Sequence, residues 1–202
     1  MASITGTVAT LLIVGSIAGR SVDGRPIELV HVAGPGPRVL VVGSIHGNEP
    51  AGIAIVRALE RTHHPTADLW LVPDLNPDGH VSDTRENAHG VDLNRDFGAF
   101  TQRETKVARS IISRVHPRYT IWFHQHMDVV WAYGRSTAAG RAYARLAGMR
   151  LYHHLWEPGS GTRWQNHQRG GGASFTVELP AGELSAAGVR RQVRAVLKLA
   201  FA

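Results

Sequence analysis

Short apolar segments alternate with polar turns along the chain, and this alternation predicts a series of β-strands. Most segments are rich in Val, Ile and Leu, and Gly or Pro borders them. We expect strands over Thr10–Val14, Ile27–Val32, Val39–Ile45, Leu69–Leu75, Tyr119–His126 and Ser174–Leu179.

Between these strands, apolar residues recur at helical spacing. Asn48 is expected to cap a helix that has Pro50 in its first turn and ends near Glu60. Thr101 and Glu104 have the spacing of a capping box and predict the start of a second helix. Two more helices are expected over residues 136–149 and 186–201, and two long loops over 76–100 and 156–172. This alternation predicts an α/β fold, with a mixed, mostly parallel sheet, helices on both faces and the site at the carboxyl ends of strands.

Length and composition narrow the class of protein. The 202 residues suit a single catalytic domain over residues 1–202, since a chain of this length can cover a sheet with helices. Hydrophobic residues make up 43% and no segment is dominated by charge, which excludes a disordered chain. Cysteine is absent, so disulfides and thiolate chemistry are excluded and histidine and carboxylates remain as metal ligands.

The net charge of +6 comes almost wholly from arginine, because Lys106 and Lys198 are the only lysines. A basic surface favours an anionic partner. The arginines are spread along the chain and do not alternate with aromatic residues, so nucleic acid is not expected as a partner.

The apolar stretch over residues 9–19 is too short to span a bilayer, so stable membrane insertion is not expected. Residues 1–10 contain no Lys or Arg, which favours an opening strand over the core of a signal peptide. A longer exported precursor would leave the same appearance. The compartment therefore stays open, with an extracellular or wall-associated location favoured over the cytoplasm.

Histidine and glutamate residues, the residue types that bind catalytic zinc, follow or end several of the apolar segments. His46 and Glu49 stand three residues apart in HGNE, close enough for both to reach one zinc ion. Catalytic zinc takes three protein ligands, and His124 and His126 both lie on one face of a predicted strand. Spacing alone leaves both histidines open as the third ligand. Glu178 ends another apolar segment, where a carboxylate is costly without a partner, and it is a candidate general base.

Several motifs, taken in order, resemble the signatures of the zinc metallocarboxypeptidase family. They are HGNEPAG, NPDG, the Arg-x-Asn of Arg85 and Asn87, GVDLNRDF, WFHQH and FTVELP. The resemblance extends from about Gly19 to about Gly182. Within the family the chain is most similar to the bacterial murein peptide amidases, the γ-D-glutamyl-diaminopimelate amidases. This resemblance implies a zinc carboxypeptidase-like fold, a zinc cofactor and hydrolase activity on a peptide.

The resemblance also implies roles for individual residues. The family's ligand histidine directly follows an apolar strand end, which favours His124 over His126, so that His46, Glu49 and His124 hold zinc. Asp92 matches the carboxylate that accepts the free ring N–H of the first ligand histidine. Glu178 matches the catalytic glutamate, which takes a proton from the attacking water.

Further positions match groups that contact the substrate. Arg85 matches the residue that steadies the oxyanion. Asn94 and Arg95 match the pair that binds a substrate carboxylate, a role for which a guanidinium is well shaped. The segment GSGTRWQNH is similar to the substrate loop of the murein-directed branch, in which Arg163 or His167 would meet a second carboxylate. The implied substrate is a murein stem peptide cut next to diaminopimelate.

The sequence departs from the pattern of the zinc metallocarboxypeptidase family at two points. No tyrosine stands where digestive carboxypeptidases carry a mobile one, and Asp96 is expected to offset part of the charge of Arg95.

Acyl-amino-acid hydrolases of the aspartoacylase and succinylglutamate desuccinylase type share strings like HGNE and DLNR, although NPDG and FTVELP favour the peptidases. A metal-free module that binds wall peptides is the alternative from another class, and the presence of every expected ligand argues against it. Manganese or cobalt could replace zinc on the same ligands in vitro.

Overall fold

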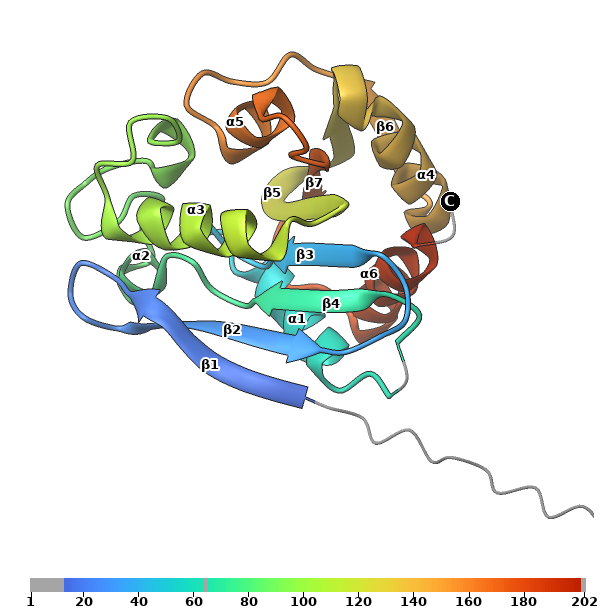
Figure 1. The fold of residues 1–202 in the computed structure, drawn as a ribbon, viewed down its shortest axis with the longest axis horizontal. Coiled ribbons are helices and arrows are strands. Elements are labelled where there is room, and N and C mark those ends of the chain that lie inside the picture. Colours follow the sequence, from blue (N-terminus) through green and yellow to red (C-terminus); the bar gives the residue numbers. More distant parts are fainter. Residues whose placement is uncertain (1–12, 64, 201–202) are drawn as a thin grey trace, which may run out of the picture.

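The computed structural model describes residues 13–63 and 65–200 and places seven strands in one sheet (Figure 1). The strand order is β1-β2-β4-β3-β5-β6, with β7 pairing on β5. The pairs β1·β2 and β2·β4 are antiparallel, whereas β3·β4, β3·β5, β5·β6 and β5·β7 are parallel. The strands are β1 Ile13–Arg20, β2 Pro26–Val32, β3 Arg38–Val42, β4 Asp68–Val72, β5 Tyr119–Ala132, β6 Arg150–His153 and β7 Ala173–Pro180.

Helices cover both faces of this sheet, so the predicted fold class is confirmed (Figure 1). One apolar cluster joins the sheet to α1, α4 and α6, and a second cluster, which includes Trp122, joins the other face to α3. The helices are α1 Ala51–Glu60, α2 Pro77–Ser82, α3 Arg103–Val115, α4 Thr137–Ala147, α5 Gly161–His167 and α6 Ala186–Leu199, with 3-10 turns at Leu93–Arg95 and Gly134–Ser136. Among the described residues, no helix has the length and apolarity that crossing a membrane requires.

The parallel strands bring their carboxyl ends to one edge of the sheet, as the sequence pattern predicts. The HGNE segment follows β3 at this edge and packs directly on the NPDG segment that follows β4. Gly47 permits this approach, because a Cβ on it would lie 1.9 Å from the Gly79 carbonyl carbon. The Asn48 N–H donates to the Thr84 carbonyl oxygen at 3.1 Å, which fixes the two segments together.

Most predicted elements are present, with bounds that differ in places. The first strand continues to Arg20, and residues 10–12 of its prediction lie outside the described residues. β5 continues past His126 to Ala132, and the elements β6, α2 and α5 were not predicted. β6 forms because it pairs with β5. The helices α2 and α5 lie within the predicted loops and are too short to show a clear helical period.

Both predicted helix caps are wrong. Pro50, not Asn48, stands at the cap position of α1, and the α3 cap position is held by Gln102 without a side-chain bond. The side chain of Thr101 instead donates to Asp96, and Glu104 is fully buried and accepts from the Val22 N–H.

Asp96 is also not the charge partner of Arg95 that the sequence suggested. It is 5% exposed and accepts hydrogen bonds from the Thr101 N–H at 3.0 Å, the Gln102 N–H at 2.9 Å and the hydroxyls of Thr101 and Thr105. These donors lie just before α3 and in its first turn, so Asp96 holds the start of the helix in place of the predicted cap. Burial raises the pKa of Asp96, but the hydrogen bonds from Thr101, Thr105 and Gln102 outweigh burial and hold its pKa below the usual range.

Replacing Asp96 by asparagine should destabilise the fold by about 2 kcal/mol at neutral pH, because buried donors lose a charged acceptor. The folded pKa of Asp96 lies below its unfolded value, so this contribution is complete at neutral pH and is lost as pH falls through the folded pKa. Urea denaturation of wild type and Asp96→Asn at decreasing pH measures the difference. The difference in the free energy of unfolding should shrink as pH falls, and a difference that stays constant with pH would contradict this assignment. Asp83→Asn, at an exposed position, is the matched control.

Candidate metal centre and active site

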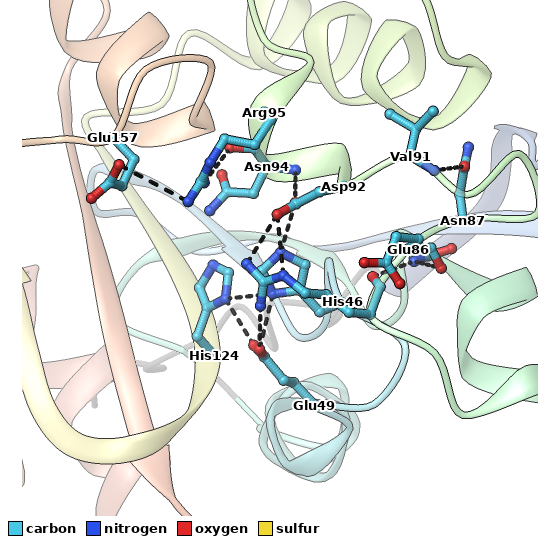
Figure 2. Close-up of polar contacts among 12 residues, drawn as sticks. His46, Glu49, Glu86, Asn87, Val91, Asp92, Asn94, Arg95, His124 and Glu157 are labelled. Atoms are coloured by element: carbon cyan, nitrogen blue, oxygen red, sulfur yellow. Dashed lines mark hydrogen bonds and ion pairs between the residues drawn. The ribbon is translucent and has the colours of Figure 1, made fainter.

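Three side chains from separate parts of the chain meet at the carboxyl edge of the sheet (Figure 2). His46 and Glu49 come from the segment between β3 and α1, and His124 comes from β5. The His46 Nδ1 lies 3.0 Å from Glu49 Oε1, and the His124 Nδ1 lies 2.9 Å from Glu49 Oε2 and 3.1 Å from His46 Nδ1. All three residues are buried. The structure therefore brings together the three predicted zinc ligands.

Asp92 lies on the far side of the His46 ring, as the resemblance implied (Figure 2). The His46 Nε2 is 3.0 Å from Asp92 Oδ1, which also accepts from the Asn94 N–H at 2.8 Å. A carboxylate can only accept, so the ring proton of a neutral His46 belongs on Nε2. Asp92 thus leaves the Nδ1 lone pair of His46 facing Glu49 and His124.

The donor set fits a divalent cation of the zinc type. Two imidazole nitrogens and a carboxylate oxygen all lie within 4.8 Å of one another. With the His46 proton held on Nε2, His124 is the only one of the three residues that can supply a hydrogen to the others, while Arg85 NH1 and the Gln125 N–H donate to Glu49 from outside. The remaining inward atoms offer lone pairs. A cation would satisfy all of these lone pairs together, and the nitrogen and oxygen types match zinc.

The pKa values of the three residues are shifted by burial and by their close contacts with one another and with Asp92. Burial raises the pKa of Glu49, but its contacts with the imidazoles of His124 and His46 outweigh burial and hold the pKa far below the usual range. Burial lowers the pKa of His46, but contacts with Asp92 and Glu49 raise it above the ordinary value. For His124, burial dominates and lowers the pKa.

Glu178 lies on β7 directly beside His124 on β5, and it lines the same cavity as the cluster. Its side chain is 6% exposed, yet it makes no hydrogen bond or ion pair with any residue in the described ranges 13–63 and 65–200. Burial, and to a smaller extent the charge of Glu49, raises the pKa of Glu178 to about 7. A buried carboxylate held free of partners in a cavity has the properties of a general base.

Arg85 reaches the cluster from the loop after α2. Its NH1 donates to Glu49 Oε1 at 3.1 Å, while Nε and NH2 lie 3.1 and 3.0 Å from Asp92 Oδ2. A guanidinium has five N–H donors, so these contacts leave two for a substrate oxygen. Arg85 lines the cavity and is available for the predicted oxyanion contact.

The cavity above the cluster has a volume of about 270 Å³, and Asn94 and Arg95 lie on its wall. The Asn94 Oδ1 accepts from the Gly161 N–H at 3.0 Å, and Arg95 is exposed. His126 also lines this cavity but is exposed and stays outside the three-residue cluster. The geometry therefore favours His124 over His126 as the third ligand, a choice that spacing alone left open.

Arg163 and His167, predicted to contact a second substrate carboxylate, lie outside the cavity over the cluster. Both are exposed residues of α5 that line a second hollow of about 770 Å³ and do not line the cavity over the cluster. The two hollows share a wall formed by residues 154–157. Sequence reasoning missed Glu157 in this wall, and its one signal was an acidic residue within a Gly-rich and aromatic loop.

Replacing Asp92 by asparagine is expected to weaken zinc binding by about 10 to 100-fold, because the partner that orients His46 loses its charge. Competition with a chromogenic chelator measures the affinity, and Asp83→Asn again serves as the exposed control. Unchanged affinity in Asp92→Asn would show that this contact does not tune the site.

Residues 8–116, more than half of the chain, match the model of the zinc carboxypeptidase family, and the chain belongs to that family. It is 35% identical over 98 residues to carboxypeptidase SOL1 of Arabidopsis thaliana, a match that covers 39% of this chain and 20% of the relative. It is 32% identical over 130 residues to carboxypeptidase Z of Homo sapiens, which covers 46% of this chain and 20% of that protein. The matches thus span about a fifth of the length of these relatives.

Solved structures share the fold over nearly the whole chain. The murein-tripeptide amidase MpaA from Escherichia coli O157 gives a TM-score of 0.74 at 23% identity and covers 92% of this chain and 91% of its own. Carboxypeptidase A from Helicoverpa armigera gives 0.75 at 18% identity, with 94% and 68% covered. A succinylglutamatedesuccinylase/aspartoacylase from Rhodobacter sphaeroides gives 0.70 at 20% identity, with 93% and 64% covered.

Proposed function

We propose that the protein is a zinc-dependent hydrolase that cleaves an amide bond next to a carboxylate-bearing residue. The observation that carries this proposal is the convergence of His46, Glu49 and His124, with Glu178 on the wall of the same cavity. Family membership supports the chemistry, because zinc carboxypeptidases cut peptide bonds at a residue with a free carboxylate.

In this proposal His46, Glu49 and His124 hold the zinc ion. When bound, zinc supplies Lewis acidity that polarises the amide carbonyl and lowers the pKa of water. Asp92 holds the His46 ring so that Nδ1 faces inward. Arg85 offers its two remaining N–H groups to the oxygen that becomes negative in the tetrahedral state.

Glu178 moves the proton. Its carboxylate takes a proton from the attacking water and delivers it to the nitrogen of the departing amine. A pKa near 7 suits this exchange, since the group can both accept and release a proton near neutral pH. The absence of a hydrogen-bond partner among the described residues leaves both of its oxygens free for water and substrate.

The proposed substrate is a murein stem peptide cut between γ-D-glutamate and diaminopimelate. Asn94 and Arg95 would bind the carboxylate next to the cleaved bond, and Arg163 and His167 would contact a second carboxylate from the neighbouring hollow. The basic net charge of +6 suits a substrate with several carboxylates. The fold shared with a murein-tripeptide amidase agrees with this choice.

Mass spectrometry of defined peptides after incubation with the zinc-loaded protein tests the proposal. The tripeptide L-Ala-γ-D-Glu-meso-diaminopimelate should release diaminopimelate. N-acetylaspartate and N-succinylglutamate test the acyl-amino-acid hydrolase alternative in the same assay, and turnover of these compounds alone would overturn our proposal. Tight binding of the tripeptide by purified protein that carries no metal and shows no turnover would instead identify a wall-peptide binding module.

A further inference from the structure

The two hollows beside the metal centre share a wall, and Glu157 is the acidic residue in it. It lines both the cavity over the cluster and the second hollow with Arg163 and His167. Its carboxylate lies 4.0 Å from Arg95 NH2, and both side chains are 44% exposed (Figure 2). Arg95 and Arg163 are both expected to bind substrate carboxylates, and an acidic side chain on the same walls would repel such groups. Glu157 is therefore expected to have a different role in substrate binding.

The loop that carries Glu157 is fixed to the segment that carries Asn94 and Arg95. The Phe97 N–H donates to the Gly159 carbonyl oxygen at 2.9 Å, and the Gly161 N–H donates to Asn94 Oδ1 at 3.0 Å. Gly159 has a φ of +74°, and a Cβ there would lie 2.1 Å from the Arg95 carbonyl oxygen. The relative positions of Asn94, Arg95 and Glu157 are therefore set by the backbone.

The second hollow also offers a cation without a protein partner. The Arg163 guanidinium makes no hydrogen bond or ion pair within residues 13–63 and 65–200. The His167 Nδ1 lies 2.7 Å from the Arg163 carbonyl oxygen, so that nitrogen carries the proton and Nε2 remains free. Arg163 and Glu157 thus place one positive and one negative group on the wall of a single hollow.

The geometry points to a subsite for a zwitterionic α-amino acid group at the far end of the substrate side chain. Glu157 would bind the ammonium group and Arg163 would bind the carboxylate. Asn94 and Arg95 would hold the carboxylate next to the cleaved bond. Leu155 and Trp156 lie between the two hollows and suit the alkyl chain that joins the two ends. This inference rests on the proposed function and assigns the residue recognised there as a diamino dicarboxylate such as meso-diaminopimelate. Glu157 and Arg163 are then the residues that determine specificity.

Three tripeptides that differ only in the third residue test the inference through kcat/KM. Diaminopimelate offers both charged groups, lysine offers only the ammonium, and 2-aminopimelate offers only the carboxylate. In Glu157→Gln, kcat/KM should fall about 10-fold or more on the diaminopimelate and lysine peptides and stay unchanged on the aminopimelate peptide. In Arg163→Gln, it should fall by a similar factor on the diaminopimelate and aminopimelate peptides and stay unchanged on the lysine peptide.

Glu183→Gln and Arg169→Gln remove matched charges from exposed positions outside both hollows and should change none of the three values. An equal loss on all three peptides in Glu157→Gln would reduce Glu157 to a support for Arg95 and overturn the inference, while the proposed hydrolysis stands. If wild type cleaves none of the peptides, the proposed function fails. Calorimetric binding of the same peptides to wild type and both variants then decides on the subsite, and equal affinities throughout would overturn it.

Discussion

Replacing Glu178 by glutamine should reduce turnover of a cleaved peptide by about 10³-fold, because the variant keeps the shape of the side chain but cannot accept a proton. The position supports a large effect, since Glu178 is buried beside His124 and has no other partner among the described residues. The amide is not expected to disturb the metal ligands. The measurement is kcat, together with zinc content by mass spectrometry.

Glu183→Gln is the matched control, because Glu183 lies on the exposed loop that follows β7 and does not line the cavity over the cluster. It should retain full activity. Wild-type turnover by Glu178→Gln would refute the assignment of the general base. Loss of zinc from this variant would instead place Glu178 among the ligands.

Replacing His124 by alanine should weaken zinc binding by more than about 100-fold and abolish activity, because the site keeps only two of its three ligands. His126→Ala is the matched control. It removes the second histidine of the same strand, which is exposed and lies outside the cluster. Zinc titration of both variants, with circular dichroism as a check of folding, measures the difference. Loss of zinc from His126→Ala with retention by His124→Ala would reverse the assignment.

The sequence was sufficient to predict the residues that gather at the metal centre. His46 and Glu49 share one short motif, and a predicted strand end directed His124 to the same edge of the sheet. Between His124 and His126 the spacing was undecided, and the burial of His124 beside Glu49 separates them in the structure. Residues that follow parallel strands converge for a topological reason, which makes this part of a site predictable.

The outer part of the site was less predictable, because it depends on how loops pack on one another. Arg163 and His167 were predicted to contact a second substrate carboxylate, but nothing in the sequence indicated that α5 would place them in a hollow beside the catalytic cavity. Asp96 follows Arg95 in the chain, yet it turns inward to the start of α3. Adjacent residues in a 3-10 turn face different directions, and the hydrophobic pattern carries no information on which of them faces the substrate.

The central claim is that His46, Glu49 and His124 hold one zinc ion in the cavity that Glu178 lines. A crystal structure of zinc-loaded protein, with anomalous scattering recorded at the zinc edge, tests it most directly. The account predicts a single strong anomalous peak in contact with His46 Nδ1, His124 Nδ1 and the Glu49 carboxylate. A peak held by other side chains, or none at these atoms under saturating zinc, would contradict it.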